Sequence, residues 1–174
     1  IYTPNGDSTV SIVNKGTIKL TNTNGGTAIK AQKQIGDFIY NVSDSFANID
    51  NQGDIIITGK NNNGIYVYNS SGEGSLKNSG TISISGTVDK SSFGLAYGGG
   101  DSTVFANSGD IKMDLSDNIG TAIGLSFNST QNFNNSGNIE IKSDTVSELK
   151  DSTGGKATGI YVRLSNSMKE NINT

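Results

Sequence analysis

Apolar and polar residues alternate in short runs along this chain, and one run returns at regular intervals. The pattern Asn-x-Gly-x-Ile-x-(Ile, Leu or Met) occurs five times, at intervals of 37, 27, 29 and 28 residues. Alternation with a period of two puts both apolar positions on one face of a strand. A repeat of about 20–50 residues is typical of a solenoid. The four columns are Asn14, Asn51, Asn78, Asn107 and Asn135; Gly16, Gly53, Gly80, Gly109 and Gly137; Ile18, Ile55, Ile82, Ile111 and Ile139; and Leu20, Ile57, Ile84, Met113 and Ile141.

Two more apolar motifs recur in each period. One lies two positions before the Asn, as Ile12, Ile49, Leu76, Phe105 and Phe133. The other, in the middle of the period, begins at Gly64, Gly94, Gly124 and Gly159 and reads Gly-Ile-Tyr-Val in its clearest copies. Three strands of about 3–5 residues per period, joined by Gly- and Asn-rich turns, predict an all-β fold. We expect a right-handed, three-sided parallel β-helix of about 5–6 rungs of roughly 27–30 residues; a β-roll or a repeated β-sandwich of hairpins is the alternative.

The Asn and Gly columns predict how successive rungs stay in register. An Asn at the same corner of every rung can align its amide with those above and below, giving a hydrogen-bonded ladder. The Gly two residues later suggests a bend with positive φ, which a side chain would strain. We therefore assign both columns a structural role.

Composition narrows the chemistry that the chain can carry. Only 32% of its residues are hydrophobic and 7% aromatic, with 23 Gly, which suits the narrow core of a solenoid. The chain has no His and no Cys, the residues that usually supply zinc ligands, thiolate nucleophiles and imidazole bases. We expect no cofactor and no metal; the solitary Gly98-Gly99-Gly100-Asp101 lacks the tandem copies of calcium-binding repeats. A net charge of −3 disfavours nucleic acid, and the apolar runs are too short to enter a membrane.

Departures from the period are the candidate binding regions. The first period is longer than the others, and its surplus near residues 33–41 contains Phe38, Ile39 and Tyr40. Such an insertion predicts a recognition loop, or a segment that folds back over the edge of the core. A polar loop is expected near residues 144–154. Tyr66 and Tyr161 should point outward and could stack on a sugar, although Tyr is also common in exposed strands.

Both ends of the sequence interrupt the repeat pattern. The chain has no initial Met and no signal peptide, and Asn171-Ile172-Asn173-Thr174 resembles the start of another repeat. Residues 1–174 are therefore interpreted as a single β-helical fragment of a longer stalk, monomeric within that chain.

The columns Asn-Ser-Gly-Thr-Ile-x-Ile and Gly-Ile-Tyr-Val resemble the passenger-domain repeats of type V autotransporters, especially large Asn-rich adhesins of Gram-negative anaerobes and, more distantly, vacuolating-toxin-like passengers. The resemblance covers essentially the whole chain. It implies a β-helix exported through a C-terminal outer-membrane β-barrel outside this sequence. It further implies display on the bacterial surface, with a receptor or glycan of host cells or other bacteria as the partner.

We therefore expect an adhesin or stalk segment that is not an enzyme. The alternatives are a toxin passenger and a polysaccharide lyase or glycoside hydrolase, since many parallel β-helices act on sugars with grouped carboxylates. Asp54 and Asp110 are the candidates for such a pair. They occupy one column two rungs apart, about 10 Å, with Thr81 between them. The single Arg, Arg163, provides no cationic clamp.

Overall fold

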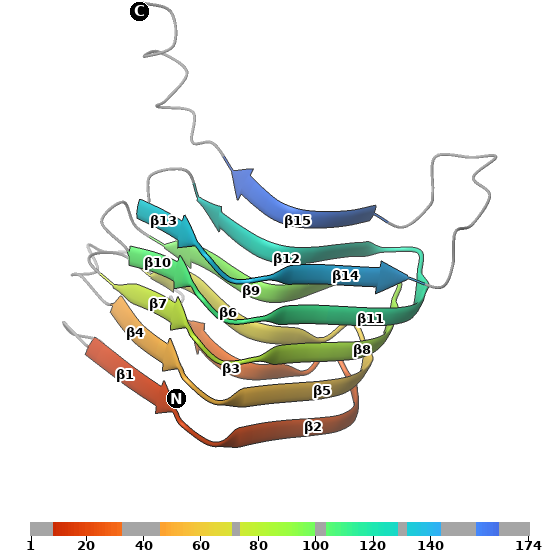
Figure 1. Ribbon diagram of the computed structural model, residues 1–174, viewed down its shortest axis with the longest axis horizontal. Helices are drawn as coiled ribbons and strands as arrows, with labels where there is room; N and C mark the ends of the chain where they lie inside the picture. The colour runs from red at the N-terminus through yellow and green to blue at the C-terminus, as the bar shows by residue number, and fades with distance from the viewer. Residues whose placement is uncertain are drawn as a thin grey trace, which may run out of the picture.

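The computed structural model confirms an all-β, three-sided parallel β-helix (Figure 1). It describes residues 9–32, 46–70, 74–99, 104–128, 132–143 and 156–163. Their strands form three parallel sheets of five strands each. The chain winds upward as a right-handed coil, from red at the bottom to blue at the top of Figure 1. Each rung supplies one strand to each sheet, so rung 1 is β1–β3 and rung 5 is β13–β15.

Each sheet stacks every third strand of the chain. Sheet A contains β1 (Thr9–Asn14), β4 (Phe46–Asn51), β7 (Ser75–Asn78), β10 (Val104–Asn107) and β13 (Asn132–Asn135). Sheet B contains β2 (Thr17–Asn24), β5 (Asp54–Lys60), β8 (Ile82–Val88), β11 (Ile111–Asn118) and β14 (Ile139–Ser143). Sheet C contains β3 (Thr27–Gln32), β6 (Asn63–Ser70), β9 (Ser91–Gly99), β12 (Thr121–Asn128) and β15 (Lys156–Arg163).

The strands are longer than the sequence pattern suggested. Most strands of sheets B and C have seven or eight residues and β9 has nine, whereas we predicted about 3–5. The predicted strand lengths covered only the inward apolar residues of each motif. Backbone pairing with the rungs above and below continues through the polar residues that follow them. Parallel ladders thus extend into segments that look like turns in the sequence.

Register between rungs follows the columns of the repeat. Asn14 pairs with Asn51 and Asn51 with Asn78 in sheet A, while Ile18 pairs with Ile55 in sheet B. The register shifts between Leu20 and Thr23, where β2 contains one more residue than β5 at the corner with sheet C. The first, longer interval therefore does not disturb the stacking of the Asn and Ile columns.

The core is a narrow column enclosed by the three sheets. In rung 2 the inward residues Ile49, Ile55, Ile57, Ile65 and Val67 are at most 2% exposed. Burial of each such side chain is worth about 1.5–3 kcal/mol. Because every rung adds only a few of these residues, the whole chain can fold with the low apolar content noted above.

Four aromatic rings gather where sheets A and C face each other in the upper rungs. Phe127 stacks on Phe133 with ring centroids 4.4 Å apart and on Phe105 at 5.4 Å. Tyr97 meets Phe105 edge to face at 6.4 Å. Phe105 and Phe133 belong to the column before the Asn, and Tyr97 and Phe127 to the last position of the middle motif. These four described aromatic residues thus fill the core and are not available as a surface for a ligand.

Candidate functional site

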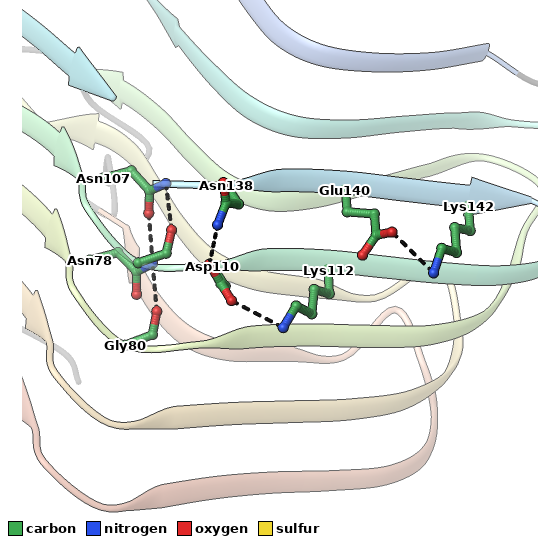
Figure 2. Close-up of polar contacts among 9 residues, drawn as sticks. Asn78, Gly80, Asn107, Asp110, Lys112, Asn138, Glu140 and Lys142 are labelled. Carbon is green, nitrogen blue, oxygen red and sulfur yellow. Dashed lines mark hydrogen bonds and ion pairs between the residues drawn. The ribbon is translucent and has the colours of Figure 1, made fainter. Parts of the chain in front are cut away.

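The corner between sheets A and B carries a ladder of asparagine side chains. Asn14 donates a hydrogen bond from Nδ2 to Oδ1 of Asn51 at 2.7 Å, and Asn51 donates in the same way to Asn78 at 2.7 Å. Asn78 then donates to Asn107 at 2.7 Å, and Asn107 to Asn135 at 2.8 Å. The ladder predicted from the Asn column is therefore continuous through all five rungs, and Figure 2 shows its step from Asn78 to Asn107.

Each ladder residue also fixes the backbone of its own corner. Nδ2 of Asn78 donates to the carbonyl oxygen of Gly80 at 3.2 Å. The backbone carbonyl of Asn78 accepts hydrogen bonds from the N–H groups of Ser108 and Gly109 in the next rung. Asn78 is 1% exposed. Because buried polar groups are costly unless they are paired, these asparagines are committed to folding and are not available to a ligand.

The glycines of the same corner have a different role from the one we predicted. Gly53, Gly80, Gly109 and Gly137 are not among the residues with positive φ. A Cβ on any of them would instead lie 2.0 Å from the carbonyl oxygen of the corner glycine one rung earlier. The column is glycine because consecutive rungs approach each other too closely there for any side chain.

The outer face of sheet B carries charged side chains that alternate along and between strands. Asp110 and Lys112 form an ion pair at 3.0 Å, and Glu140 and Lys142 form another at 3.0 Å in the rung above (Figure 2). Lys112 lies opposite Glu140 in the strand register. Asn138 donates to Oδ1 of Asp110 at 3.1 Å. Opposite charges are thus neighbours both along a strand and between stacked strands, which avoids repulsion between like charges.

These pairs stabilise the charged forms of their members. The Lys112 ammonium group, and next the Asn138 amide, hold the pKa of Asp110 below its ordinary value of 3.8. Glu140 raises the pKa of Lys142. Because a lowered carboxyl pKa adds stability above the ordinary value, this contribution is lost as the pH falls through the folded-state pKa of Asp110.

The two candidate carboxylates for sugar cleavage lie where the sequence placed them. Thr81 stands between Asp54 and Asp110 in the register of sheet B, so the two acids are separated by two rungs. The ion pair of Asp110 with Lys112 keeps that carboxyl ionised. A glycosidase acid needs the opposite, a carboxyl whose pKa is raised. Asp110 therefore does not suit the role of the acid in such a pair.

A third set of polar groups, not identified as a site from the sequence, occupies the corner between sheets B and C. Lys60 and Asp89 form an ion pair at 2.5 Å, and Asn61 donates to the same carboxyl group at 2.5 Å. Oδ1 of Asn61 accepts the backbone N–H groups of Asp89 and Lys90. Asn61 has a φ of 53°, which asparagine tolerates better than most residues. In the sequence, the run of three Asn residues before Gly64 was the available signal for this cluster.

The two tyrosines that were predicted to point outward, Tyr66 and Tyr161, lie on the outer face of sheet C. Tyr66, Ala96, Ser126 and Tyr161 occupy one column, so two rungs, those of Ala96 and Ser126, separate the two tyrosines. Tyr161 is 47% exposed, whereas the ring of Tyr66 is 6.1 Å from that of Phe93. Tyr161 is thus the better placed of the two for contact with a ligand. The other predicted contact residues, Phe38, Ile39 and Tyr40, lie outside the described residues, as do the loop near 144–154 and the side chain of Arg163.

Carbon-13 NMR titration of the aspartate carboxyl groups tests the two ion pairs separately. We expect the pKa values of both Asp89 and Asp110 to lie below 3.8 in the native protein. Lys112→Gln should raise the pKa of Asp110 toward its ordinary value and leave Asp89 unchanged, and Lys60→Gln should do the reverse. Each variant is the control for the other, because the Asp110–Lys112 pair lies on the outer face of sheet B and the Lys60–Asp89 pair lies at the corner between sheets B and C. Equal shifts at both carboxyl groups in either variant would contradict these assignments.

Within the described part of the chain, acidic side chains do not gather in a group of three that could hold a metal ion. The same residues include no helix long and apolar enough to cross a membrane. Comparison with protein-family models, with curated proteins and with solved structures finds no match to this chain.

Proposed function

We propose that the chain is a non-enzymatic scaffold, a β-helical segment of a cell-surface adhesin or stalk. The proposal rests on the difference between positions that all rungs share and positions that vary from rung to rung. Positions shared by the rungs form the Asn ladder, the glycine corner and the core, all of which serve folding. Outward positions differ from rung to rung, so the same scaffold offers a changing surface along its length. One outward column of sheet B consists of Lys19, Ile56, Ser83, Lys112 and Glu140.

The contacts of Asp110 give this candidate carboxylate a role within the scaffold itself. That carboxylate is held ionised by Lys112 and is hydrogen-bonded to Asn138, so it serves rung-to-rung cohesion. The proposed partner is a receptor or glycan on host cells or on other bacteria. The resemblance to autotransporter passengers supports display on the bacterial surface, with attachment through an outer-membrane β-barrel.

Tyr161 is the described residue that best fits a sugar-stacking contact. Its side chain is half exposed on the outer face of sheet C, and an aromatic face presents apolar surface together with a hydroxyl group. Lys30 precedes Tyr66 in the same column. Tyr66 is partly covered, so its contribution to binding should be smaller.

The proposal is tested by coating beads with the purified chain and measuring their binding to epithelial cells, to bacteria and to a glycan array. Tyr161→Ala should weaken binding about tenfold, since a central aromatic anchor carries much of the energy of a small interface. Ser83→Ala on sheet B is the matched control and should bind normally. Deletion of residues 33–41 tests the predicted recognition loop in the same assay, with circular dichroism to verify the fold.

Two results would overturn the scaffold proposal. One is the absence of binding to every cell type and glycan by the intact chain. The other is release of reducing ends from acidic or neutral polysaccharides that is abolished by Asp54→Asn or Asp110→Asn, because that result would establish an enzyme.

A further inference from the structure

Apolar side chains line the outer face of sheet C as well as the core. Ala96 and Ile123 are 5% and 7% exposed, yet neither belongs to the cluster of buried residues that fills the β-helix. Phe93 is the register partner of Ile123, and its ring lies 6.1 Å from that of Tyr66 in the rung below. Ser92 is fully buried, so alternation along β9 directs Phe93 outward. We call Tyr66, Phe93, Ala96 and Ile123 the outer apolar strip; its two rings are partly exposed and can touch a ligand.

The charged residues on the strands of sheet C all have the same sign. These strands contain Lys30, Lys156 and Arg163 and no Asp or Glu, whereas sheet B carries both signs. Of the residues that the structure describes, no carboxylate forms an ion pair with Lys30 or Lys156, while Lys112 and Lys142 on sheet B are both paired. A basic face without carboxylates of its own is complementary to an anionic partner.

Lys30 and Lys156 lie on either side of the outer apolar strip. Lys30 is the register partner of Tyr66, in the rung below it. Lys156, in rung 5, is the partner of Thr121, which lies two residues before Ile123. Both lysines are exposed and project sideways from the β-helix, as the strip does. Further rungs above or below would extend this face and would not cover it.

The spacing of these groups suits a chain of sugars better than a peptide. Stacked strands are about 4.8 Å apart, so the face from Lys30 to Lys156 spans four steps, or roughly 19 Å. One such step is close to the length of a sugar ring, so a polysaccharide laid along the β-helix can place a ring against each rung. An acidic peptide would gain affinity mainly by pairing with a strand edge, but the inner strands of sheet C are already paired on both sides.

We propose that the outer face of sheet C binds an acidic polysaccharide. Phe93 and Tyr66 pack against the apolar faces of sugar rings, and Lys30 and Lys156 donate hydrogen bonds to carboxylate or sulfate groups on the sugars. Tyr161, which occupies the column of Tyr66, adds a further ring to this face. The inference rests on the proposed function, since it names the class of glycan that the scaffold holds and the sheet that holds it.

Isothermal titration calorimetry of the intact chain with four polymers tests the class of ligand. We expect polygalacturonate and chondroitin sulfate to bind at least about tenfold more tightly than dextran, which lacks charge, and poly-glutamate, which lacks sugar rings. Added salt should weaken the binding, because exposed charges are screened. Equal affinity for dextran would show that the basic residues have no part in recognition, and equal affinity for poly-glutamate would show that the rings have none. Either result would overturn the proposal.

Two pairs of matched variants test the site. Lys30→Gln and Lys19→Gln make the same change of charge in the same rung, on sheet C and sheet B respectively. We expect Lys30→Gln to weaken binding of polygalacturonate about threefold and Lys19→Gln to leave it unchanged. Phe93→Ala should weaken it about tenfold. Ile56→Ala, on the outer face of sheet B, is its control, and circular dichroism verifies the fold of each variant.

Equal effects within either matched pair would place the binding elsewhere and overturn the proposal. If Phe93→Ala does not fold, Lys30→Glu takes its place, because it reverses a charge without removing a ring, and it should weaken binding more than Lys30→Gln does. The bead assay described above separates this inference from the proposed function. A chain that adheres to cells but binds neither acidic polysaccharide overturns this inference alone, whereas a chain that binds no cell and no glycan overturns the scaffold proposal as well.

Discussion

Gly80→Ala is expected to destabilise the β-helix by roughly 3 kcal/mol or more. Its Cβ would lie 2.0 Å from the carbonyl oxygen of Gly53, and the neighbouring atoms are backbone atoms that cannot rotate away. Relief would require rungs 2 and 3 to separate at this corner, which would also stretch the hydrogen bond from the Gly80 N–H to the carbonyl of Asn51. Urea unfolding followed by far-UV circular dichroism measures the loss.

Gly16→Ala is the matched control because it makes the same change in the same column, where a Cβ would meet no atom of the described residues within 4 Å. We expect its stability to remain within about 0.5 kcal/mol of the native chain. Hydrogen exchange should show lost protection in β5 and β8 for Gly80→Ala only. Equal destabilisation by both substitutions would show that the glycines are needed for their own backbone conformation and not for clearance between rungs.

Asn78→Ala should cause the second large loss of stability. The substitution removes the central residue of the ladder. It takes away one of the two acceptors of Asn51 Nδ2, the amide that donates to Oδ1 of Asn107, and the side-chain donor to the Gly80 carbonyl. A buried polar group left unpaired costs about 1–3 kcal/mol, so a total of roughly 3 kcal/mol or more is expected in urea unfolding. Asn134→Ala is the control, since Asn134 is exposed and its register partner Ala106 is already alanine.

Asn78→Asp distinguishes the donor role of this amide from its packing. The carboxylate has nearly the same shape but faces two acceptor oxygens, so burial and repulsion should raise its folded-state pKa above the ordinary value of about 3.9. A raised pKa in the folded state means that stability is retained below the ordinary value and lost as the pH rises through the folded-state pKa. We therefore expect Asn78→Asp to be most stable in acid and least stable at neutral pH. A variant that is equally stable at both pH values would contradict the ladder.

The sequence predicted the fold because a solenoid places the same residue types at equivalent positions of successive rungs. Every rung uses the same corner, so Asn, Gly and paired Ile residues recur at nearly constant intervals, and the period of two within each run separates inward from outward residues. The amide ladder could also be expected from the Asn column alone. Residues such as Lys60 and Asp89 could not be paired in this way, because they occur once and their contact depends on how two corners bend.

The candidate binding residues remain predictions. The structure places Tyr66 and Tyr161 in one outward column with Ala96 and Ser126 between them, and Tyr161 is exposed there. Recognition depends on residues that rungs do not share, and a repeat pattern carries no information about those.

By itself, the sequence of this protein determined the number of strands per period, the inward columns and the ladder, since each is a local pattern repeated in register. Only the tertiary structure decided why the corner is glycine, which charges meet across sheet B and how Lys60, Asn61 and Asp89 come together at the next corner. Those features depend on distances between backbones of different rungs, for instance the 2.0 Å that would separate a Cβ at position 80 from the oxygen of Gly53. No single stretch of sequence contains such a distance, because it arises only when one rung is stacked on another.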